Sequence, residues 1–421
     1  AGIPSGRGLD HCTVGLGAGH RFSAWGRALQ YIEIQLTGLL RRLLLPCLVV
    51  AALGPAAAQA DAVRIAVFNA GLSRSGPGLL LRDILKGGDP QVIAVAGIIG
   101  AVRPDILLLL GFDHDAESRA LTAFRTALRG DGIDYPHSYS PTQNAGLPSG
   151  LDLDGDGRLR GPADAFGFAE FRGQGGMATL SRWPLDLDAA RDFSTVLWRD
   201  LAEPDLPVQA DGTPFPSEPA QAAMRLSSFG HWDVPVTLPD GRAIHLLASY
   251  SSPPVFDGAE DMNGKRNRDE LRFWVQYLEG QRFRDADGQE AAFAGGPYVL
   301  LAGLNADPAD GDGARADLRA MLSGGLFRDP EPDSAGGTVA SVEQGGVNRT
   351  HTGDPARDTA DWRDTDGQPG NLRVDYVLPS TDLTVHGAGV FWPAPGTEDG
   401  DLVARGQELG IRHRLVWVDL E

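Results

Sequence analysis

A series of short apolar runs, each followed at once by polar residues, sets the strongest limit on how this chain can fold. The run in PDILLLLGFDHD (104–115) spans one strand length without a polar residue, which is typical of a strand buried on both faces. Many strands with few helical crossovers favour an α/β sandwich over a regular βαβ winding. Further strands are expected at 63–71, 175–185, 231–238, 243–250, 298–304, 373–378 and 414–420, and helices near 90–102, 116–129 and 266–280.

Composition limits the class of protein further. The chain has 421 residues, 42% of them hydrophobic, which is enough for a sizeable core, and no low-complexity linker interrupts 61–421, which favours one domain there. The two cysteines, Cys12 and Cys47, precede residue 61, so this domain cannot contain a disulfide. The net charge of −19 disfavours broad nucleic-acid binding, because an acidic surface repels polyanions.

The first sixty residues have the pattern of a secretion signal. The Arg41-Arg42 pair precedes the apolar run LLLPCLVVAALGPAAA, and AQA at 58–60 matches an A-x-A cleavage site. Residues 41–60 are therefore expected to be a signal peptide, with an N-terminal membrane anchor as the alternative, and 1–40 an upstream segment before the true start. We expect a periplasmic or secreted bacterial protein that leaves the membrane once the signal is cleaved.

Three of the apolar runs lead into distinctive polar signatures: YVLLAGLNADP (298–308), NLRVDYVLPS (371–380) and RHRLVWVDLE (412–421). Together they resemble the endonuclease/exonuclease/phosphatase superfamily. In that family the first motif is GD-x-N, the second is a strand that carries an Asp, and the third is an Asp-His pair followed by a strand. The resemblance implies a four-layered αββα sandwich over essentially 62–421.

The same resemblance implies metal-dependent hydrolysis of a phosphate ester, as in a phosphodiesterase, phosphatase or nuclease. In such a site Mg²⁺ or Mn²⁺ polarises the phosphoryl oxygens and a His-Asp pair handles protons. Four residues match the family's catalytic positions, namely Asn69, Asn305, Asp375 and His413, and Asp375 is also a candidate metal ligand. For the two asparagines, capping of a turn is the alternative.

Four other positions depart from the family pattern. Gly111 stands where the family has a metal-binding Glu, Tyr250 where it has a catalytic His, and Gly303 where GD-x-N has its Asp. Arg412 replaces the Asp that precedes His413. These changes affect the metal, the base and the group that orients the histidine, since a phenol of pKa about 10 is a poor base near neutral pH. The sequence therefore predicts impaired hydrolysis and leaves open whether the protein is an enzyme.

Other polar residues are candidates for a rearranged site. Asp113 lies two residues after Gly111, and on a regular strand it would share that face and could replace the missing metal ligand. Asn144, His231 and Asn267 are candidate substrate-binding residues of a polar anion pocket.

The segment SGLDLDGDGRLRGPAD (149–164) carries a separate metal candidate. Three aspartates at alternate positions, followed by a glycine, match the start of a calcium loop, although the twelfth position is Ala163 rather than Glu. The flanking sequence lacks EF-hand helices, so an isolated structural Ca²⁺ loop is expected, with an acidic surface turn as the alternative. The candidate ligands are Asp152, Asp154, Asp156 and Asp164.

Two functions follow from these observations. The first is hydrolysis of phosphate esters by a rearranged site, and the second is a non-catalytic pseudoenzyme that binds a phosphorylated or other anionic small ligand in the same cleft. A decayed relative without a ligand is a third possibility.

Overall fold

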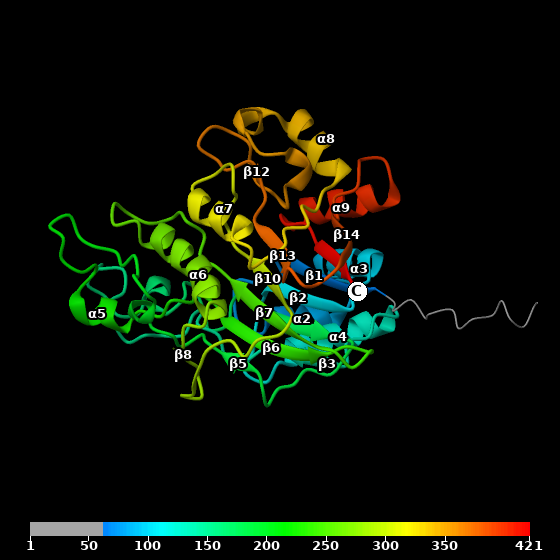
Figure 1. The fold of residues 1–421 in the computed structure, drawn as a ribbon. Coiled ribbons are helices and arrows are strands. Elements are labelled where there is room, and N and C mark those ends of the chain that lie inside the picture. The colour runs from blue at the N-terminus through cyan, green and yellow to red at the C-terminus, as the bar shows by residue number, and fades with distance from the viewer. Residues whose placement is uncertain (1–61) are drawn as a thin grey trace, which may run out of the picture. The chain divides into compact units, whose positions relative to one another are not determined.

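Two β-sheets form the centre of the structure, a computed structural model that describes residues 62–421 (Figure 1). The expected upstream segment (1–40) and signal peptide (41–60) lie outside the described residues. The six-stranded sheet has the order β14 (Val385–Val390), β15 (Val416–Leu420), β1 (Val63–Asn69), β2 (Ile106–Phe112), β4 (Gly176–Ser181), β3 (His137–Tyr139). The five-stranded sheet has the order β13 (Asp375–Pro379), β10 (Tyr298–Gly303), β7 (Ala243–Tyr250), β6 (His231–Thr237), β5 (Arg191–Asp192).

The remaining elements are two small ribbons and the helices. The ribbons are β8 (Phe283–Arg284) with β9 (Glu290–Ala291) and β11 (Ala360–Asp361) with β12 (Asn371–Leu372). The helices are α2 (Leu79–Lys86), α3 (Pro90–Val102), α4 (Arg119–Gly130), α5 (Glu218–Ala223), α6 (Met262–Leu278), α7 (Arg315–Ser323), α8 (Ala335–Gln344) and α9 (Glu398–Glu408).

Alternation along β2 explains how the two sheets pack. Leu107 and Leu109 join a core cluster with α3 and α4, whereas Ile106, Leu108 and Leu110 point the other way into a cluster shared with the second sheet. Every residue of β2 is buried. The strand is therefore apolar on both faces because both faces are covered, as its sequence predicted.

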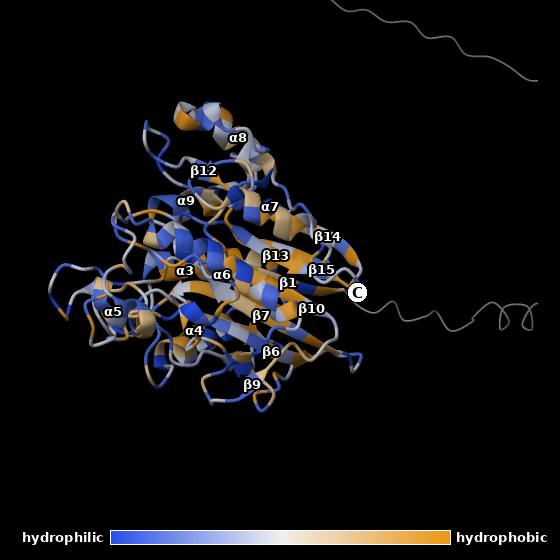
Figure 2. Cartoon of the chain, turned by 60° about the vertical axis from the view of Figure 1, so that its left-hand side comes forward, coloured by the Kyte–Doolittle hydropathy of each residue, from blue (hydrophilic) through white to orange (hydrophobic). Residues whose placement is uncertain are grey.

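A third core cluster covers the outer face of the five-stranded sheet. Leu247 and Leu300 of that sheet pack there with Leu271, Phe273 and Trp274 of α6. The layers are thus helices, sheet, sheet and helices, which confirms the four-layered αββα sandwich. Figure 2 shows the hydrophobic strands at the centre and hydrophilic residues along the helices around them.

Local sequence accounts for several helix boundaries. The Asp89 side chain accepts a hydrogen bond from Val92 N, and Pro90 occupies the first turn, so α3 begins where capping chemistry favours it. Helix α6 begins at Met262, earlier than the expected residue 266. Within the described part of the chain, no helix is both long and apolar enough to cross a membrane.

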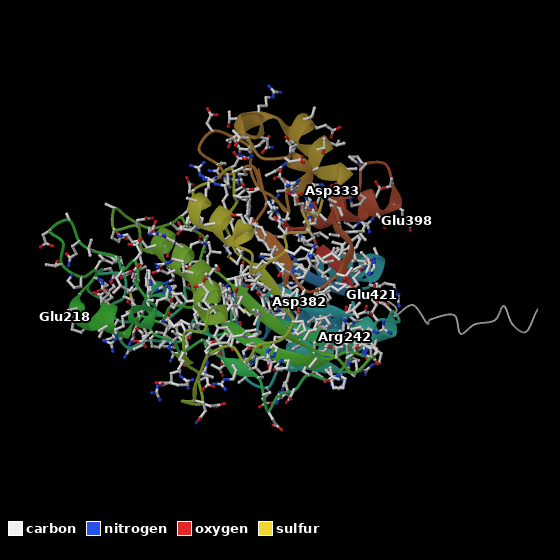
Figure 3. The ribbon with its side chains drawn as sticks, viewed as in Figure 1. Glu218, Arg242, Asp333, Asp382, Glu398 and Glu421 are labelled. Atoms are coloured by element: carbon white, nitrogen blue, oxygen red, sulfur yellow. The ribbon has the colours of Figure 1, made fainter. Side chains whose placement is uncertain are left out.

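The strand directions bring the polar signatures to one end of the two sheets. β1 runs parallel to β2, with Asn69 opposite Leu110, and β7 runs parallel to β10, with Tyr250 opposite Gly303. Asp375 begins the antiparallel β13 on the other side of Gly303. Arg242, Asp382 and Glu421 lie next to the other ends of these strands, and Figure 3 labels them together near the C-terminus.

Candidate functional site

A cavity of about 1150 Å³ opens at the end of the sheets where the polar signatures meet. Tyr250, Asn305 and His413 line it, and so does Arg412. The loop before β6, the loops after β7 and β10 and the segment 153–168 supply most of the remaining wall. The volume is sufficient for a ligand larger than a phosphate group alone.

A chain of hydrogen bonds joins four side chains across the two sheets. His413 Nδ1 lies 2.7 Å from Asp375 Oδ2, and His413 Nε2 lies 3.3 Å from Asn69 Nδ2. Asn69 Nδ2 also donates to the Tyr250 hydroxyl at 2.9 Å. Because the carboxylate accepts at Nδ1, the proton of a neutral His413 is placed there and Nε2 is left as an acceptor. The structure thus brings three expected site residues, Asn69, Asp375 and His413, into one network.

Two further groups hold this network in place. Thr359 Oγ1 donates to Asp375 Oδ2 at 3.1 Å, and the edge of the Trp362 ring faces the His413 ring with centroids 5.3 Å apart. The Tyr250 ring stacks on Phe229 at 4.3 Å. Burial, and secondarily the charge of Asp375, raises the pKa of Tyr250 to about 12, so its hydroxyl is neutral and can donate to an acceptor in the cavity.

Gly111 and Gly303 are tightly enclosed by their neighbours. A Cβ on Gly303 would lie 2.8 Å from Leu110 Cδ1 and 2.9 Å from Tyr250 Cδ2, so these two side chains fill the space an aspartate would need. Gly111 has φ +65°, and a Cβ there would overlap Asn69 Oδ1 and lie 3.0 Å from Gly71 N. Restoring the family's carboxylates would therefore require movement of the backbone or of neighbouring side chains.

The residues present do not fit the divalent cation that the family resemblance implies. Mg²⁺ requires near-octahedral coordination by oxygen atoms. Among the family positions only Asp375 keeps a carboxylate, and its Oδ2 already accepts from His413 and Thr359. Its Oδ1 is buried without a hydrogen-bond partner among residues 62–421, and Arg412 adds a positive charge to the same wall. One free carboxylate oxygen beside a cation is a poor metal site.

Asp113 lies outside this cavity, contrary to the expectation of a shared face with Gly111. The pairing of β2 with β4 shifts register between Leu110 and Phe112, and this irregularity breaks the two-residue alternation on which the expectation depended. The Asp113 carboxylate accepts from Arg74 N and Gly175 N, each at 2.9 Å. It therefore joins two loops and does not share the cavity with Asp375 and His413.

The three expected substrate-binding residues lie outside the cavity wall. Asn144, His231 and Asn267 do not line the cavity and are almost fully buried. Asn267 Nδ2 donates to the backbone oxygens of Ser252 and Leu304, and Asn144 Nδ2 donates to two other backbone oxygens. Buried polar side chains commonly satisfy backbone groups in this way.

The acidic loop brings three of its four expected ligands together. Carboxylate oxygens of Asp152, Asp154 and Asp156 lie within 4.8 Å of one another. Asp164 is not part of this group, because its two oxygens accept from Leu153 N and Gly161 N. Burial and the charges of Asp156 and Asp164 raise the pKa of Asp154.

The sequence did not point to Arg266, which lines the cavity, or to Glu270, which joins two of the lining residues. Glu270 on α6 accepts from Ser228 N at 2.8 Å and from Ser252 N at 2.6 Å, and so joins the loops that flank β6 and β7. Burial raises the pKa of Glu270 to about 7 despite these bonds. Arg266, one helical turn earlier, lines the cavity. The only sequence signal was their one-turn spacing on a helix.

The chain belongs to the endonuclease/exonuclease/phosphatase family, whose sequence model matches residues 66–400. This agrees with the two-sheet fold and with the Asp375–His413 pair. A sequence comparison with curated proteins finds no match.

A comparison with solved structures finds several that this chain resembles. An endonuclease/exonuclease/phosphatase from Beutenbergia cavernae is 18% identical with a TM-score of 0.48, over 86% of this chain and 72% of that one. The mannosyl-6-phosphatase from Bacteroides thetaiotaomicron is 13% identical with a TM-score of 0.41, over 85% and 99%. The beta toxin from Staphylococcus aureus with bound magnesium ions is 11% identical with a TM-score of 0.40, over 86% and 100%.

The contact of Gly303 with Tyr250 predicts strong coupling between the two positions. Gly303→Asp should lower the free energy of unfolding by about 1–3 kcal/mol, because the new side chain overlaps the Tyr250 ring and Leu110. Adding Tyr250→His should recover about 1 kcal/mol of this loss. Urea unfolding of both single variants and the double variant measures the coupling. Gly130→Asp, which points into open space, is the control, and additive losses would contradict the proposed contact.

His231 predicts a pH-dependent stability term. Burial lowers the pKa of His231 from its usual 6.5 to about 4. Between these values the unfolded chain takes up a proton that the folded chain does not, so stability falls with falling pH, by up to about 3 kcal/mol. The difference in unfolding free energy between the wild type and His231→Gln should therefore narrow from pH 7 to pH 4.5. A constant difference across that range would contradict a neutral buried histidine.

Proposed function

We propose that the cavity binds a phosphate ester or another small anionic molecule without a divalent cation. In this proposal the protein is a pseudoenzyme with respect to its family's metal-dependent hydrolysis. The observation that carries the proposal is the packing of Tyr250 and Leu110 against Gly303, which fills the place of a family carboxylate. The Asp375–His413 pair is retained beside it.

Six acidic residues line the cavity, but hydrogen-bond donors in one part of its wall suit an anion. The neutral Tyr250 hydroxyl has its own proton to donate, since it accepts from Asn69. The Arg412 side chain is exposed to the cavity and forms no ion pair within the described residues. A guanidinium can bind two oxygens of a phosphate or carboxylate at once, which offers the charge that a cation would otherwise supply.

Hydrolysis of a phosphate ester is the second candidate function, and one observation favours it. The bond from His413 Nδ1 to Asp375 leaves Nε2 as the acceptor in the cavity wall. In that role Nε2 would exchange its contact with Asn69 for an attacking water and take its proton as the water oxygen bonds to phosphorus. The P–O bond to the ester alcohol would break, the imidazolium would return the proton to the leaving alkoxide, and the Tyr250 hydroxyl would donate a hydrogen bond to a phosphoryl oxygen.

Binding and turnover measured side by side test these two functions. Calorimetric titration of the full chain with phenyl phosphate should give the same affinity in EDTA and in Mg²⁺ or Mn²⁺, because the proposed site holds no cation. Arg412→Gln should weaken binding about tenfold. Arg242→Gln, an exposed arginine at the other end of the strands, is the matched control and should bind as the wild type does.

Hydrolysis of a phosphate ester by the protein would contradict the pseudoenzyme proposal. Hydrolysis of p-nitrophenyl phosphate or bis-p-nitrophenyl phosphate that requires a metal and disappears in Asp375→Asn would establish a metal-dependent hydrolase. Metal-independent turnover lost in the same variant would support the second candidate. Unchanged phenyl phosphate binding in Arg412→Gln would remove Arg412 from the anion site.

The acidic loop is proposed to hold a structural Ca²⁺ through Asp152, Asp154 and Asp156. The proximity of their carboxylates supports this, because bringing three negative charges together is costly without a cation. Leu153 and Asp154 also line the cavity, so the loop is part of its wall.

Calcium should raise the melting temperature of the full chain relative to EDTA, since an ion that binds only the folded state stabilises it. Asp154→Asn should abolish this increase. Asp131→Asn, at the exposed end of α4, is the control and should keep it. An equal effect of Ca²⁺ on Asp154→Asn and the wild type would exclude this loop as the site.

A further inference from the structure

Arg266 is a buried arginine whose charge is not directly paired. It is 6% exposed, and no acidic side chain lies within ion-pair distance of it among residues 62–421. Its Nε has no hydrogen-bond partner in the same part of the chain. Its guanidinium carbon lies 5.3 Å from the centroid of the Trp198 ring. Arginine is rarely buried unless it is paired, so this arrangement requires an explanation.

Glu270 is the acidic residue one helical turn away, but it is engaged elsewhere. Its two carboxylate oxygens accept from the backbone N–H groups of Ser228 and Ser252. It therefore attracts Arg266 only through its charge, without a hydrogen bond. The donors of Arg266 are left for a partner that does not belong to this part of the chain.

The place for such a partner is the cavity itself. Arg266 lines it together with Ser228 and Ser252, whose hydroxyl groups are hydrogen-bonded to each other. We refer to these three residues as the Arg266 subsite. A guanidinium beside two hydroxyls is suited to the oxygens of a carboxylate, sulfate or phosphate.

The same cavity has an extended apolar wall. Phe168 is 67% exposed and Phe256 is 89% exposed, and both line the cavity from different loops. Phe215, Val255 and Met262 continue the apolar surface. Two large exposed aromatic side chains on a shared cavity favour a ligand with an apolar body.

We propose that the cavity accepts a monomeric anionic amphiphile, with its acidic group at the Arg266 subsite and its apolar body between Phe168 and Phe256. The Arg266 guanidinium attracts the acidic group, while the six acidic residues elsewhere in the wall repel it, and the phenylalanines contact the chain or ring attached to it. This goes beyond the proposed anion site at Arg412, because it names other residues of the cavity wall and a ligand with an apolar body.

Calorimetric titration of the full chain with decanoate tests the proposal. Decanoate should bind at least about tenfold more tightly than acetate, which lacks the tail, and than decyltrimethylammonium, which has the same tail and the opposite charge. Arg266→Gln should lower the affinity for decanoate about tenfold or more. Phe256→Ser should lower it as well, and because Phe256 is exposed this variant should fold normally.

Matched controls separate this proposal from the proposed function. Val342→Ser, at an exposed apolar residue on α8, should leave decanoate binding unchanged, and so should Arg242→Gln at the other end of the strands. Decanoate binding that is insensitive to both Arg266→Gln and Phe256→Ser overturns the proposal, even if phenyl phosphate still depends on Arg412. If phenyl phosphate does not bind but decanoate binds and depends on Arg266, the proposed function fails and the Arg266 subsite is supported.

Sedimentation with phosphatidylcholine vesicles that contain phosphatidic acid tests whether the protein binds an amphiphile in a membrane surface or a monomeric amphiphile in solution. The proposal expects decanoate binding in solution and no cosedimentation that depends on Phe256. Cosedimentation lost in Phe256→Ser, without binding of monomeric decanoate, would overturn the monomeric ligand in favour of a lipid surface.

Discussion

The burial of two apolar sheet faces against each other determines where every polar signature of this protein lies. Ile106, Leu108 and Leu110 enter that interface, and a shift of one residue along β2 would replace them with the side chains that face the helices. With the register fixed, β1, β2, β7 and β10 end together, and Asn69 reaches Tyr250 across the two sheets. Packing in the core therefore assembles a site whose members are distant in the sequence.

The altered positions of this family member fit one another. Tyr250 stacks on Phe229 and lies against Gly303, and its hydroxyl continues the hydrogen-bond chain that begins at Asp375. Arginines and neutral donors line the cavity together with six acidic residues, so the proposed anion would bind beside an arginine and not across the whole wall.

The sequence predicted the fold well where burial is strong and poorly where it is not. β2 and α3 were predicted because their residues are apolar along the whole element, whereas β14, with two glycines and a half-buried surface, gives no such pattern. Motif positions predicted the neighbourhood of Asn69, Asp375 and His413. The predicted position of Asp113 was wrong because the sequence pattern of a strand does not reveal a β-bulge. Arg266 was missed because the sequence of a helix does not reveal which arginine lacks a hydrogen-bond partner.

The enclosure of Gly303 has a consequence for how this lineage can change. An aspartate at that position collides with Tyr250 and Leu110, and a side chain at Gly111 collides with Asn69. Each single substitution toward the metal site that the family resemblance implies is thus expected to give a less stable protein until the neighbouring residues have also changed. Because of the packing around these glycines, a single substitution toward the family pattern costs stability, whereas a substitution elsewhere in the site need not.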